Sequence, residues 1–328
     1  MQMEKKGPYL VKELKSLASG TQLWGKYLIL EKTGRKTKDG REIIELKIGD
    51  QTAEISVIVW DNCQVSGKLE NGAVIGLLGD MGMYNNRLQI TAKRIKVLDE
   101  DPQSYLRNPG ISIEKLIQEF DRILVSIQNP FINEVLQRVF SPTMKENFFK
   151  APAAKKIHHN YSGGLLEHTL AVVALCQQAA AIYDDLNLDL LISGALLHDI
   201  GKVVEFEIKV SPQYTTEGRL LGHIILGSEI LSSTITQMKN EGIVVPAELE
   251  WMLKHMLVSH HGALEFGSPV VPLFPEAFVL NMMDNLDAKM FVFRTKIEEN
   301  DGEAELFSNY DNFFGQHFFT YRFKEAID

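Results

Sequence analysis

Cysteine is scarce in this chain, whose 328 residues include only Cys63 and Cys176. Two cysteines so far apart support neither a disulfide framework nor a thiolate zinc site. The sequence also has no internal repeat, no low-complexity segment and no glycine-rich phosphate loop. No stretch reads as long and apolar enough to cross a bilayer, and Met1–Leu10 carries charges without a hydrophobic signal region. These absences lead us to expect a soluble, cytoplasmic protein.

Histidine is present in ordinary amount but is unevenly distributed, since eight of the nine histidines lie between His158 and His261. One of them stands in Leu190–Lys202 (LLISGALLHDIGK), which has the pattern of a buried helix stopped at Gly201. Placing the adjacent imidazole and carboxylate of His198-Asp199 in so apolar a helix costs several kcal/mol unless something compensates. A metal cation compensates directly.

Each histidine also has a structural interpretation. A single histidine in a helix is more often a core or surface residue than a ligand, so His168 or His223 alone would indicate little. The pairs His198-Asp199 and His260-His261 change this. The adjacent imidazole and carboxylate of the first pair can both reach one inorganic centre, and two adjacent histidines at a helix end rarely serve packing alone. Together the pattern predicts a ligand set for two metal ions and the hydrolysis of a phosphate ester. The seven candidate ligands are His168, His198, Asp199, His223, His260, His261 and Asp284.

Spacing alone does not decide the last of these ligands. Asp287 lies one helical turn after Asp284, in the stretch Asn281–Lys289, and would present its carboxylate on a similar face.

The order H, HD, H, HH, D resembles the HD-domain metal-dependent phosphohydrolases that carry a binuclear centre. The resemblance favours Asp284 over Asp287. It also implies that Asp199 is shared between two metals, the first held with His168, His198 and Asp284, the second with His223, His260 and His261. The family's lysine three residues after the aspartate corresponds to Lys202, and we expect it to act as a point charge on the phosphoryl oxygens, a catalytic role beside Asp199.

The types of ligand restrict the metal and the reaction. Mixed imidazole and carboxylate ligands suit Mn, Fe, Co, Ni or Zn better than Mg, which prefers oxygen. Two such ions about 3.5 to 4 Å apart can share a hydroxide that attacks phosphorus in line. No serine, cysteine or histidine nucleophile is then required.

The segment before His168 is a candidate for substrate binding. Ser162, Gly163 and Gly164 precede an apolar helical run, so the free N–H groups of the helix entry are available to a phosphate. We expect His158 and His159 to line the same mouth, where they would bind a phosphate or protonate the leaving oxygen. The alternative is an ordinary surface loop.

The first hundred residues alternate β-forming and polar residues between short turns, which is typical of strands. Five short strands in about 80 residues fit a Greek-key barrel of OB type, with a small sandwich as the competing fold. The predicted strands are Leu23–Leu30, Glu42–Ile48, Ala53–Trp60, Ala73–Met83 and Leu88–Val97.

OB barrels commonly bind single strands of nucleic acid through basic and aromatic residues. Residues 1–100 hold 16 Lys and Arg against 13 Asp and Glu, a balance of +3, while the rest of the chain has a balance of −12. Arg35, Lys36 and Lys38 share one hairpin loop and are the candidate contacts with the strand. A loop with three basic residues is also often simply solvated.

The expected organisation is a two-domain protein, with an all-β OB-like barrel over 1–100, a linker over 101–112 and an all-α HD domain over 113–328. With the motifs YSGGLLEHT at 161–169, SHHG at 259–262 and DNLDAKM at 284–290, this arrangement is similar to the YhaM-type 3'-to-5' exoribonucleases. The resemblance implies a manganese-favouring nuclease that trims single-stranded RNA, or DNA, to nucleoside 5'-monophosphates.

Three alternatives remain open at this stage. A phosphodiesterase for cyclic dinucleotides shares the ligand order, but His260-His261 is followed here by Gly262–Pro269 without the Gly-Tyr-Pro of that subgroup. A small-nucleotide phosphohydrolase would have little use for the barrel. A non-catalytic RNA-binding scaffold would normally have lost ligands. The aromatic residues of Phe313–Phe323 also make a homo-oligomer conceivable.

Overall fold

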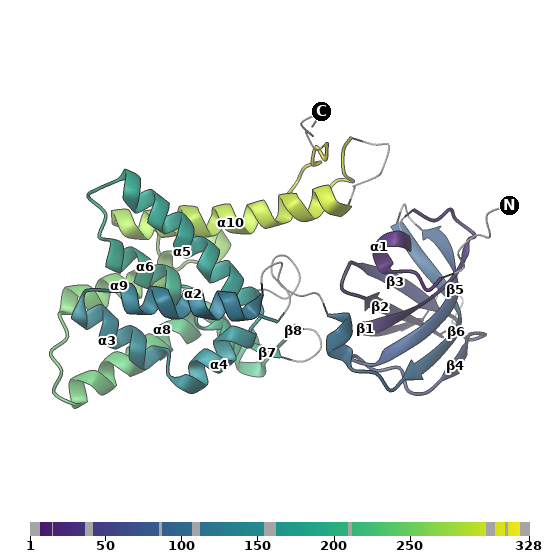
Figure 1. Ribbon diagram of the computed structural model, residues 1–328, viewed down its shortest axis with the longest axis horizontal. Helices are drawn as coiled ribbons and strands as arrows, with labels where there is room; N and C mark the ends of the chain where they lie inside the picture. Colours follow the sequence, from purple (N-terminus) through teal and green to yellow (C-terminus); the bar gives the residue numbers. More distant parts are fainter. Residues whose placement is uncertain are drawn as a thin grey trace. The chain divides into compact units, whose positions relative to one another are not determined.

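The computed structural model describes residues 7–14, 16–36, 42–84, 87–106, 112–153, 162–208, 212–299, 306–311 and 314–321 (Figure 1). The chain divides into two compact units, one before and one after residue 108. This division falls within the segment 101–112 that the sequence analysis treats as a linker. Part of that segment, the 3-10 helix η1 (Pro102–Tyr105), contacts the first unit, where the Gln51 side chain donates a hydrogen bond to the carbonyl of Ser104 at 2.9 Å.

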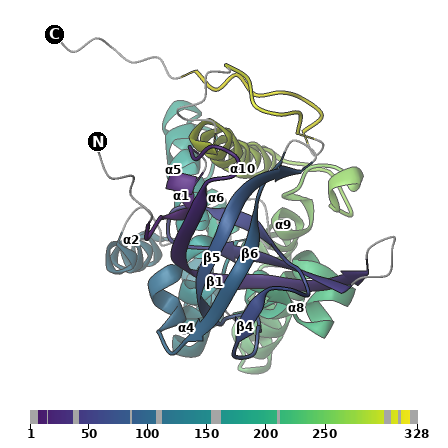
Figure 2. The same ribbon diagram turned by 90° about the vertical axis from the view of Figure 1, so that its right-hand side faces the viewer.

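The first unit is an OB barrel, as predicted (Figure 2). Its sheet order is β3-β2-β1-β5-β6, and a parallel pairing of β3 with β6 closes the barrel. The short strand β4 pairs with the free stretch of β6 and was not predicted, because three residues are too few to show alternation. The strands are β1 (Gln22–Lys36), β2 (Glu42–Gly49), β3 (Glu54–Val59), β4 (Gln64–Ser66), β5 (Val74–Tyr84) and β6 (Arg87–Leu98).

The barrel core follows from the alternation of the strands, since every second side chain points inward. Leu23, Tyr27 and Ile75 are fully buried, and the single-turn helix α1 (Val11–Leu14) adds Val11 and Leu14 to the same cluster. The Tyr27 hydroxyl donates to the carbonyl of Tyr9 at 2.8 Å, which satisfies its polar group inside an otherwise apolar core.

The second unit is helical, as predicted, with one addition: a two-stranded hairpin of β7 (Phe206–Ile208) and β8 (Pro212–Tyr214). Pro130, Pro142 and Pro275 are each the first residue of a helix, because proline is favoured in the first turn. The helices are α2 (Ile113–Ser126), α3 (Pro130–Val139), α4 (Pro142–Lys150), α5 (Gly164–Ile182), α6 (Leu188–Leu197), α7 (Lys202–Glu205), α8 (Thr216–Asn240), α9 (Ala247–Ser259), the 3-10 helix η2 (Leu264–Phe266) and α10 (Pro275–Glu299).

α6 is the centre of this unit. Every residue from Leu190 to Leu197 is buried, and α5, α9 and α10 pack around the helix. Its first turn is capped by the Asn187 side chain, which accepts from the N–H of Leu190 at 2.9 Å. A helix that is apolar on all sides must lie inside the bundle, and it delivers whatever follows Leu197 to the interior.

α5 differs from the expectation that no segment of the chain is long and apolar enough to cross a membrane. With 19 residues and a mean hydropathy of 1.4, it is long and apolar enough to cross a membrane, so the prediction that no stretch is suitable was wrong. The test is weak evidence of a span, because the core helix of a helical bundle also passes it. Here Leu165, Leu166 and Val173 belong to the apolar core that α5 shares with α6, which accounts for the composition.

Candidate metal centre

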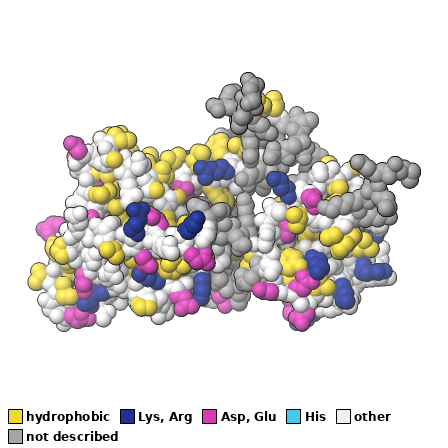
Figure 3. All heavy atoms as spheres, in the orientation of Figure 1, with side chains coloured by type: hydrophobic (Ala, Val, Ile, Leu, Met, Phe, Trp, Pro, Cys, Tyr) yellow, Lys and Arg dark blue, Asp and Glu magenta, His cyan; other side chains and the backbone are white. Residues whose placement is uncertain are grey.

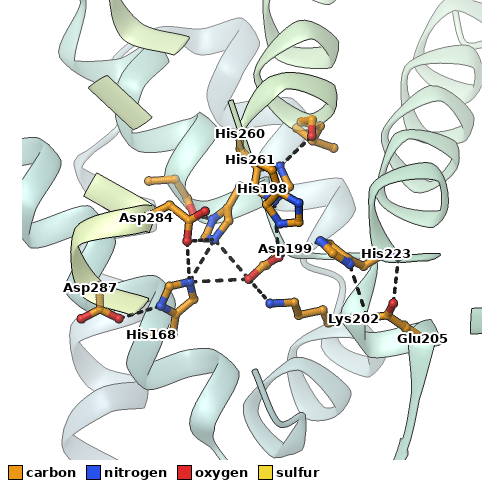
Figure 4. A network of polar contacts seen from close by, with 12 residues as sticks. His168, His198, Asp199, Lys202, Glu205, His223, His260, His261, Asp284 and Asp287 are labelled. Atoms are coloured by element: carbon orange, nitrogen blue, oxygen red, sulfur yellow. Dashed lines mark hydrogen bonds and ion pairs between the residues drawn. The ribbon is translucent and has the colours of Figure 1, made fainter. Parts of the chain in front are cut away.

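The His198-Asp199 pair lies in the turn between α6 and α7, at the buried end of the central helix (Figure 4). Both residues are at most 2% exposed. The turn passes so close to α8 that a Cβ on Gly201 would overlap the carbonyl oxygen of His223. Glycine is therefore required at this position for the backbone of α8 to approach the pair.

A first group of candidate ligands comes from three helices that meet at one point. The Nε2 atom of His168, on α5, is 3.2 Å from Oδ1 of Asp284, on α10, and 3.3 Å from Nε2 of His198. The ligand atoms of the three residues lie within 4.8 Å of one another. Two imidazoles and one carboxylate thus converge at one point.

A second group lies on the other side of Asp199. It consists of His223, on α8, and His260 and His261, which follow the end of α9, and its ligand atoms also lie within 4.8 Å of one another. The ring centroids of His260 and His261 are 4.3 Å apart, so both rings of the adjacent pair belong to this second group.

Asp199 stands between the two groups, and its two oxygens face different ways. Oδ2 is 3.2 Å from Nε2 of His198 and 3.6 Å from Nε2 of His168. Oδ1 is 3.4 Å from Nε2 of His223 and 3.7 Å from Nε2 of His260. A carboxylate in this position is suited to bridge two cations.

The Nδ1 atoms of the five histidines all face outer oxygens. His168 Nδ1 is 2.7 Å from Oδ2 of Asp287, and His223 Nδ1 is 3.4 Å from Oε2 of Glu205. Carboxylates and carbonyls only accept hydrogen bonds, so a neutral ring held this way carries its proton on Nδ1 and a lone pair on Nε2. The remaining pairs are His198 with the Ala195 carbonyl, His260 with that of Leu257 and His261 with that of Phe266, at 2.7, 2.7 and 2.8 Å.

Several buried polar atoms at the centre have no hydrogen-bond partner among the described residues. They are Oδ1 of Asp199, Nε2 of His223 and Nε2 of His260. Leaving a buried polar atom unpaired costs about 1–3 kcal/mol, and more for a charged group. Divalent cations would satisfy these atoms together, so the residues present fit the metal ions that the chemistry of the ligands suggests.

The pKa values of the histidines at the centre are shifted in opposite directions. Burial lowers the pKa of His168, but hydrogen bonds to Asp284 and Asp287 outweigh burial and raise that pKa to about 9. Burial, with repulsion from neighbouring imidazoles, lowers the pKa of His260 and of His261, which keeps both rings neutral and available as ligands.

The two carboxylates remain ionised despite their burial. Burial raises the pKa of Asp199, but Lys202 and His198 outweigh it and hold that pKa well below its usual range. For Asp284 the hydrogen bond to His168 likewise outweighs burial and lowers the pKa of the carboxyl. Ionised carboxylates are the form that a cation binds.

Lys202 is buried at the start of α7, and its Nζ atom is 2.6 Å from Oδ2 of Asp199. From the family resemblance we expect Lys202 to contact phosphoryl oxygens. The structure shows the ammonium group within the centre, where it neutralises part of the carboxylate charge, and its contact with a substrate stays a prediction.

The other predicted substrate contacts are placed less fully. His158, His159 and Lys38 lie outside the described residues. Arg35 is described by its backbone alone, in β1, and Lys36 is exposed at the end of the same strand.

Two functional residues were missed or misjudged from the sequence. Asp287 was considered as an alternative ligand, but it contacts the outer nitrogen of His168. Glu205 was not considered, although a carboxylate between Val204 and Phe206, in an apolar stretch, is a signal of a buried charge that needs a partner.

The barrel offers a separate groove of about 710 Å³. It opens where β6 changes partner, since β6 pairs with β3 up to Thr91 and with β4 from Arg94, and a bulge in the β5–β6 register lies between. The groove is lined by Trp60, Asp61, Asn62, Gln64, Leu78, Thr91, Ala92, Lys93 and Arg94.

Basic and acidic side chains lie beside one another on the described part of the barrel. On the face that Figure 3 shows, basic and acidic side chains alternate over the barrel. Lys93, for example, pairs with Asp80 at 2.7 Å, and Lys26 pairs with Glu100 at 2.6 Å.

Comparison with known proteins agrees with both halves of this description. A family model described as the HD domain matches residues 165–289, and one described as an OB-fold nucleic acid binding domain matches residues 29–98. The first match implies the binding of divalent metal, and the second is a domain type that binds nucleic acid.

Solved structures resemble the chain only in part. An OB domain from Methanosarcina mazei is 23% identical, with 31% of this chain and 94% of that domain covered and a TM-score of 0.26. The second OB-fold domain of replication protein A from Methanococcus maripaludis is 18% identical, with 28% and 96% covered and a TM-score of 0.23. Similarities this low indicate nothing about function.

A curated relative extends over much more of the chain. The 3'-5' exoribonuclease YhaM of Geobacillus sp. (strain WCH70) is 32% identical over 283 residues, which is 83% of this chain and 84% of that protein. The alignment is longer than either unit alone, so it includes residues of both. The chain therefore belongs to the family of the 3'-5' exoribonuclease YhaM.

Proposed function

We propose that this protein is a metal-dependent phosphodiesterase that shortens single-stranded RNA from the 3' end and releases nucleoside 5'-monophosphates. The observation that carries the proposal is the position of Asp199 between two groups of ligand atoms, in a chain of the YhaM family. The proposed ligands are the seven residues His168, His198, Asp199, His223, His260, His261 and Asp284.

Two divalent transition-metal ions, manganese in our proposal, would supply Lewis acidity for the activation of water and neutralise charge on the phosphate. The residues of this chain orient the ligand atoms for these ions and keep two of the rings unprotonated. The outer oxygens fix the Nε2 lone pairs toward the centre, and burial of His260 and His261 keeps those rings unprotonated.

Lys202 is proposed as the catalytic cation. Its Nζ atom lies on the Oδ2 side of Asp199, so a phosphoryl group that approaches the bridging carboxylate meets a fixed positive charge. A positioned charge in a buried site stabilises the transition state more than it would in water, since little solvent screens it.

The barrel is proposed to hold the strand at the groove beside the β6 bulge. Trp60 is half-buried at its edge and offers a ring for base stacking, while Arg94 on β6 offers charge for the phosphates. Arg35, Lys36 and Lys38 remain predicted contacts on the β1–β2 hairpin. Whether RNA or DNA is preferred is left to the assay.

The three alternatives predict different outcomes of an assay. A scaffold without catalysis does not require seven ligand side chains to converge, and they do converge here. A cyclic-dinucleotide phosphodiesterase or a small-nucleotide phosphohydrolase requires no strand-binding barrel. None of the three is favoured by an observation of its own.

The test incubates purified protein and manganese with 5'-labelled single-stranded RNA, single-stranded DNA and a cyclic dinucleotide. We expect stepwise shortening of the RNA from its 3' end and release of 5'-monophosphates, and loss of both in Asp199→Ala. Asp185→Ala makes the same change at an exposed position and should retain activity. Hydrolysis that persists in Asp199→Ala, or that is confined to the cyclic dinucleotide, would overturn the proposal.

A further inference from the structure

Glu205 holds His223 through both of its carboxylate oxygens (Figure 4). Oε1 accepts from the backbone N–H of His223 at 3.3 Å, and Oε2 is 3.4 Å from the ring Nδ1 of the same residue. Glu205 is 7% exposed, so little water competes for these contacts. The backbone and ring of one candidate ligand therefore depend on one carboxylate.

The backbone N–H of His223 is available because α8 is broken one residue earlier. Gly222 has φ 72° and ψ 158°, which is not a helical conformation. A residue inside a helix donates to the carbonyl four residues back, and the break releases that N–H. Only glycine adopts such a conformation without strain, so the break is specified by the sequence.

α7 keeps Glu205 in place against α8. At one end of α7, Gly201 lies against the carbonyl of His223, and at the other, Gly218 of α8 lies against the backbone of Glu205. A Cβ on either glycine would overlap backbone atoms of the other helix. The N–H of Thr215 also donates to the Glu205 carbonyl at 3.0 Å. The short helix after Asp199 is thus a fixed support for His223.

The two groups of ligands differ in charge. The first group contains the carboxylate of Asp284, whereas the second contains three imidazoles, and Asp199 lies beside both groups. Attraction for a divalent cation grows with the negative charge at its ligands. The first group therefore has the stronger attraction, and the second depends more on how well its imidazoles are oriented.

We propose that the His168–His198–Asp284 position fills before the His223–His260–His261 position, and that Glu205 is a positioning residue that sets the affinity of the second. This inference rests on the proposed two-metal site and adds to it an order of filling and a residue that controls it. Glu205 touches no reacting atom and acts through His223.

Replacement of Glu205 by glutamine gives a distinctive expectation. The amide oxygen takes the place that accepts from the His223 backbone, which turns the NH₂ group toward Nδ1. Nδ1 must then accept, so the proton moves to Nε2, and that nitrogen must give up the proton before it can bind a metal, which lowers the affinity. Alanine leaves Nδ1 free to carry the proton. The near-isosteric Glu205→Gln should therefore weaken the second position at least as much as Glu205→Ala.

The experiment titrates the metal-free full chain with Mn²⁺ by calorimetry and reads the imidazole tautomers in the same metal-free protein by long-range ¹H–¹⁵N NMR. We expect two steps in the wild type. Glu205→Gln should leave the first step unchanged, weaken the second by about 10- to 100-fold and show His223 with its proton on Nε2. Glu217→Gln, the same change at an exposed position of α8, should behave as wild type.

Asp287→Asn is the counterpart on the other side and should weaken the first step, because Asp287 supports His168. It provides the test if Glu205→Gln does not fold. A wild type that binds fewer than two ions would count against the proposed function itself. Two ions bound with equal affinity, equal effects of Glu205→Gln on both steps, or a milder effect of glutamine than of alanine would overturn this inference alone.

Discussion

The helical unit and the barrel differ in where their charged residues lie. In the helical unit the predicted ligands are buried and converge in two groups around Asp199. In the barrel the predicted contact Lys36 is an exposed residue at the end of a strand, and the groove is elsewhere. A buried charge must be compensated, so its presence restricts the structure. An exposed charge is stable almost anywhere and restricts very little.

The largest expected effect separates the two units by function. Chelation of divalent metal should abolish hydrolysis, because every proposed metal ligand lies in the helical unit, and should leave RNA binding by the barrel nearly unchanged. Hydrolysis is measured on labelled RNA and binding by fluorescence anisotropy. The comparison fails if hydrolysis survives chelation, or if binding is lost along with it.

The next effect tests the catalytic charge. Lys202→Gln should lower kcat by about 10²- to 10³-fold, the usual range for removal of one group that stabilises a transition state. Lys36→Gln removes an exposed lysine of the barrel and should alter kcat little. Steady-state kinetics on one RNA decide between them, and equal losses in the two variants would contradict the role of Lys202.

A smaller effect should locate the strand on the barrel. Trp60→Ala removes a proposed stacking surface worth about 1–3 kcal/mol, roughly 5- to 150-fold in affinity for single-stranded RNA. Trp24→Ala is the matched change, since Trp24 is 40% exposed on β1 and does not line the groove. Binding measured in chelator isolates the effect from hydrolysis. If Trp24→Ala weakens binding more than Trp60→Ala, the groove is not the strand site.

The tightness of packing in the two units can be compared by replacing one glycine in each unit with alanine. Gly201→Ala places a methyl group against the carbonyl of His223 and should destabilise the protein by about 1–3 kcal/mol. Gly34→Ala, in β1, meets nothing within 4 Å and should be neutral or slightly stabilising. Chemical denaturation of both variants measures the difference, and a Gly201→Ala variant as stable as wild type would show that α7 and α8 are not tightly coupled.

The last effect concerns pH. Because the folded-state pKa of His168 is raised to about 9 from 6.5, its stabilising contribution is complete below pH 6.5 and is lost as the pH rises toward 9. The metal-free protein should therefore have a lower Tm at pH 9 than at pH 6.5. With manganese bound the ring is already deprotonated, so this loss should be absent. A metal-free Tm that is constant or rises over this range would contradict the assignment.

Much of the helical unit was predictable from the sequence. Its apolar runs predict buried helices, and the polar residues inside those runs need a compensating partner. The run Leu190–Lys202 predicted both a core helix and the place of the pair at its end. The choice between Asp284 and Asp287 was not predictable from spacing, because both aspartates approach the same imidazole from different sides. The resemblance to a family decided it.

Neither the contact of Glu205 with His223 nor the barrel groove could be predicted from the sequence, and the reasons differ. Glu205 meets His223 only because the β7–β8 hairpin and the Gly222 break bring residues 18 apart together. The groove depends on β4, three residues long, and on a bulge in the β5–β6 pairing. Neither feature leaves a periodic signal in the sequence, since each depends on where the strands end.

The most direct test of the central claim is an anomalous-scattering map of crystals grown with manganese. The account predicts two peaks, one in contact with His168, His198 and Asp284 and the other with His223, His260 and His261, with the carboxylate of Asp199 between them. A single peak, or ions bound away from Asp199, would contradict it.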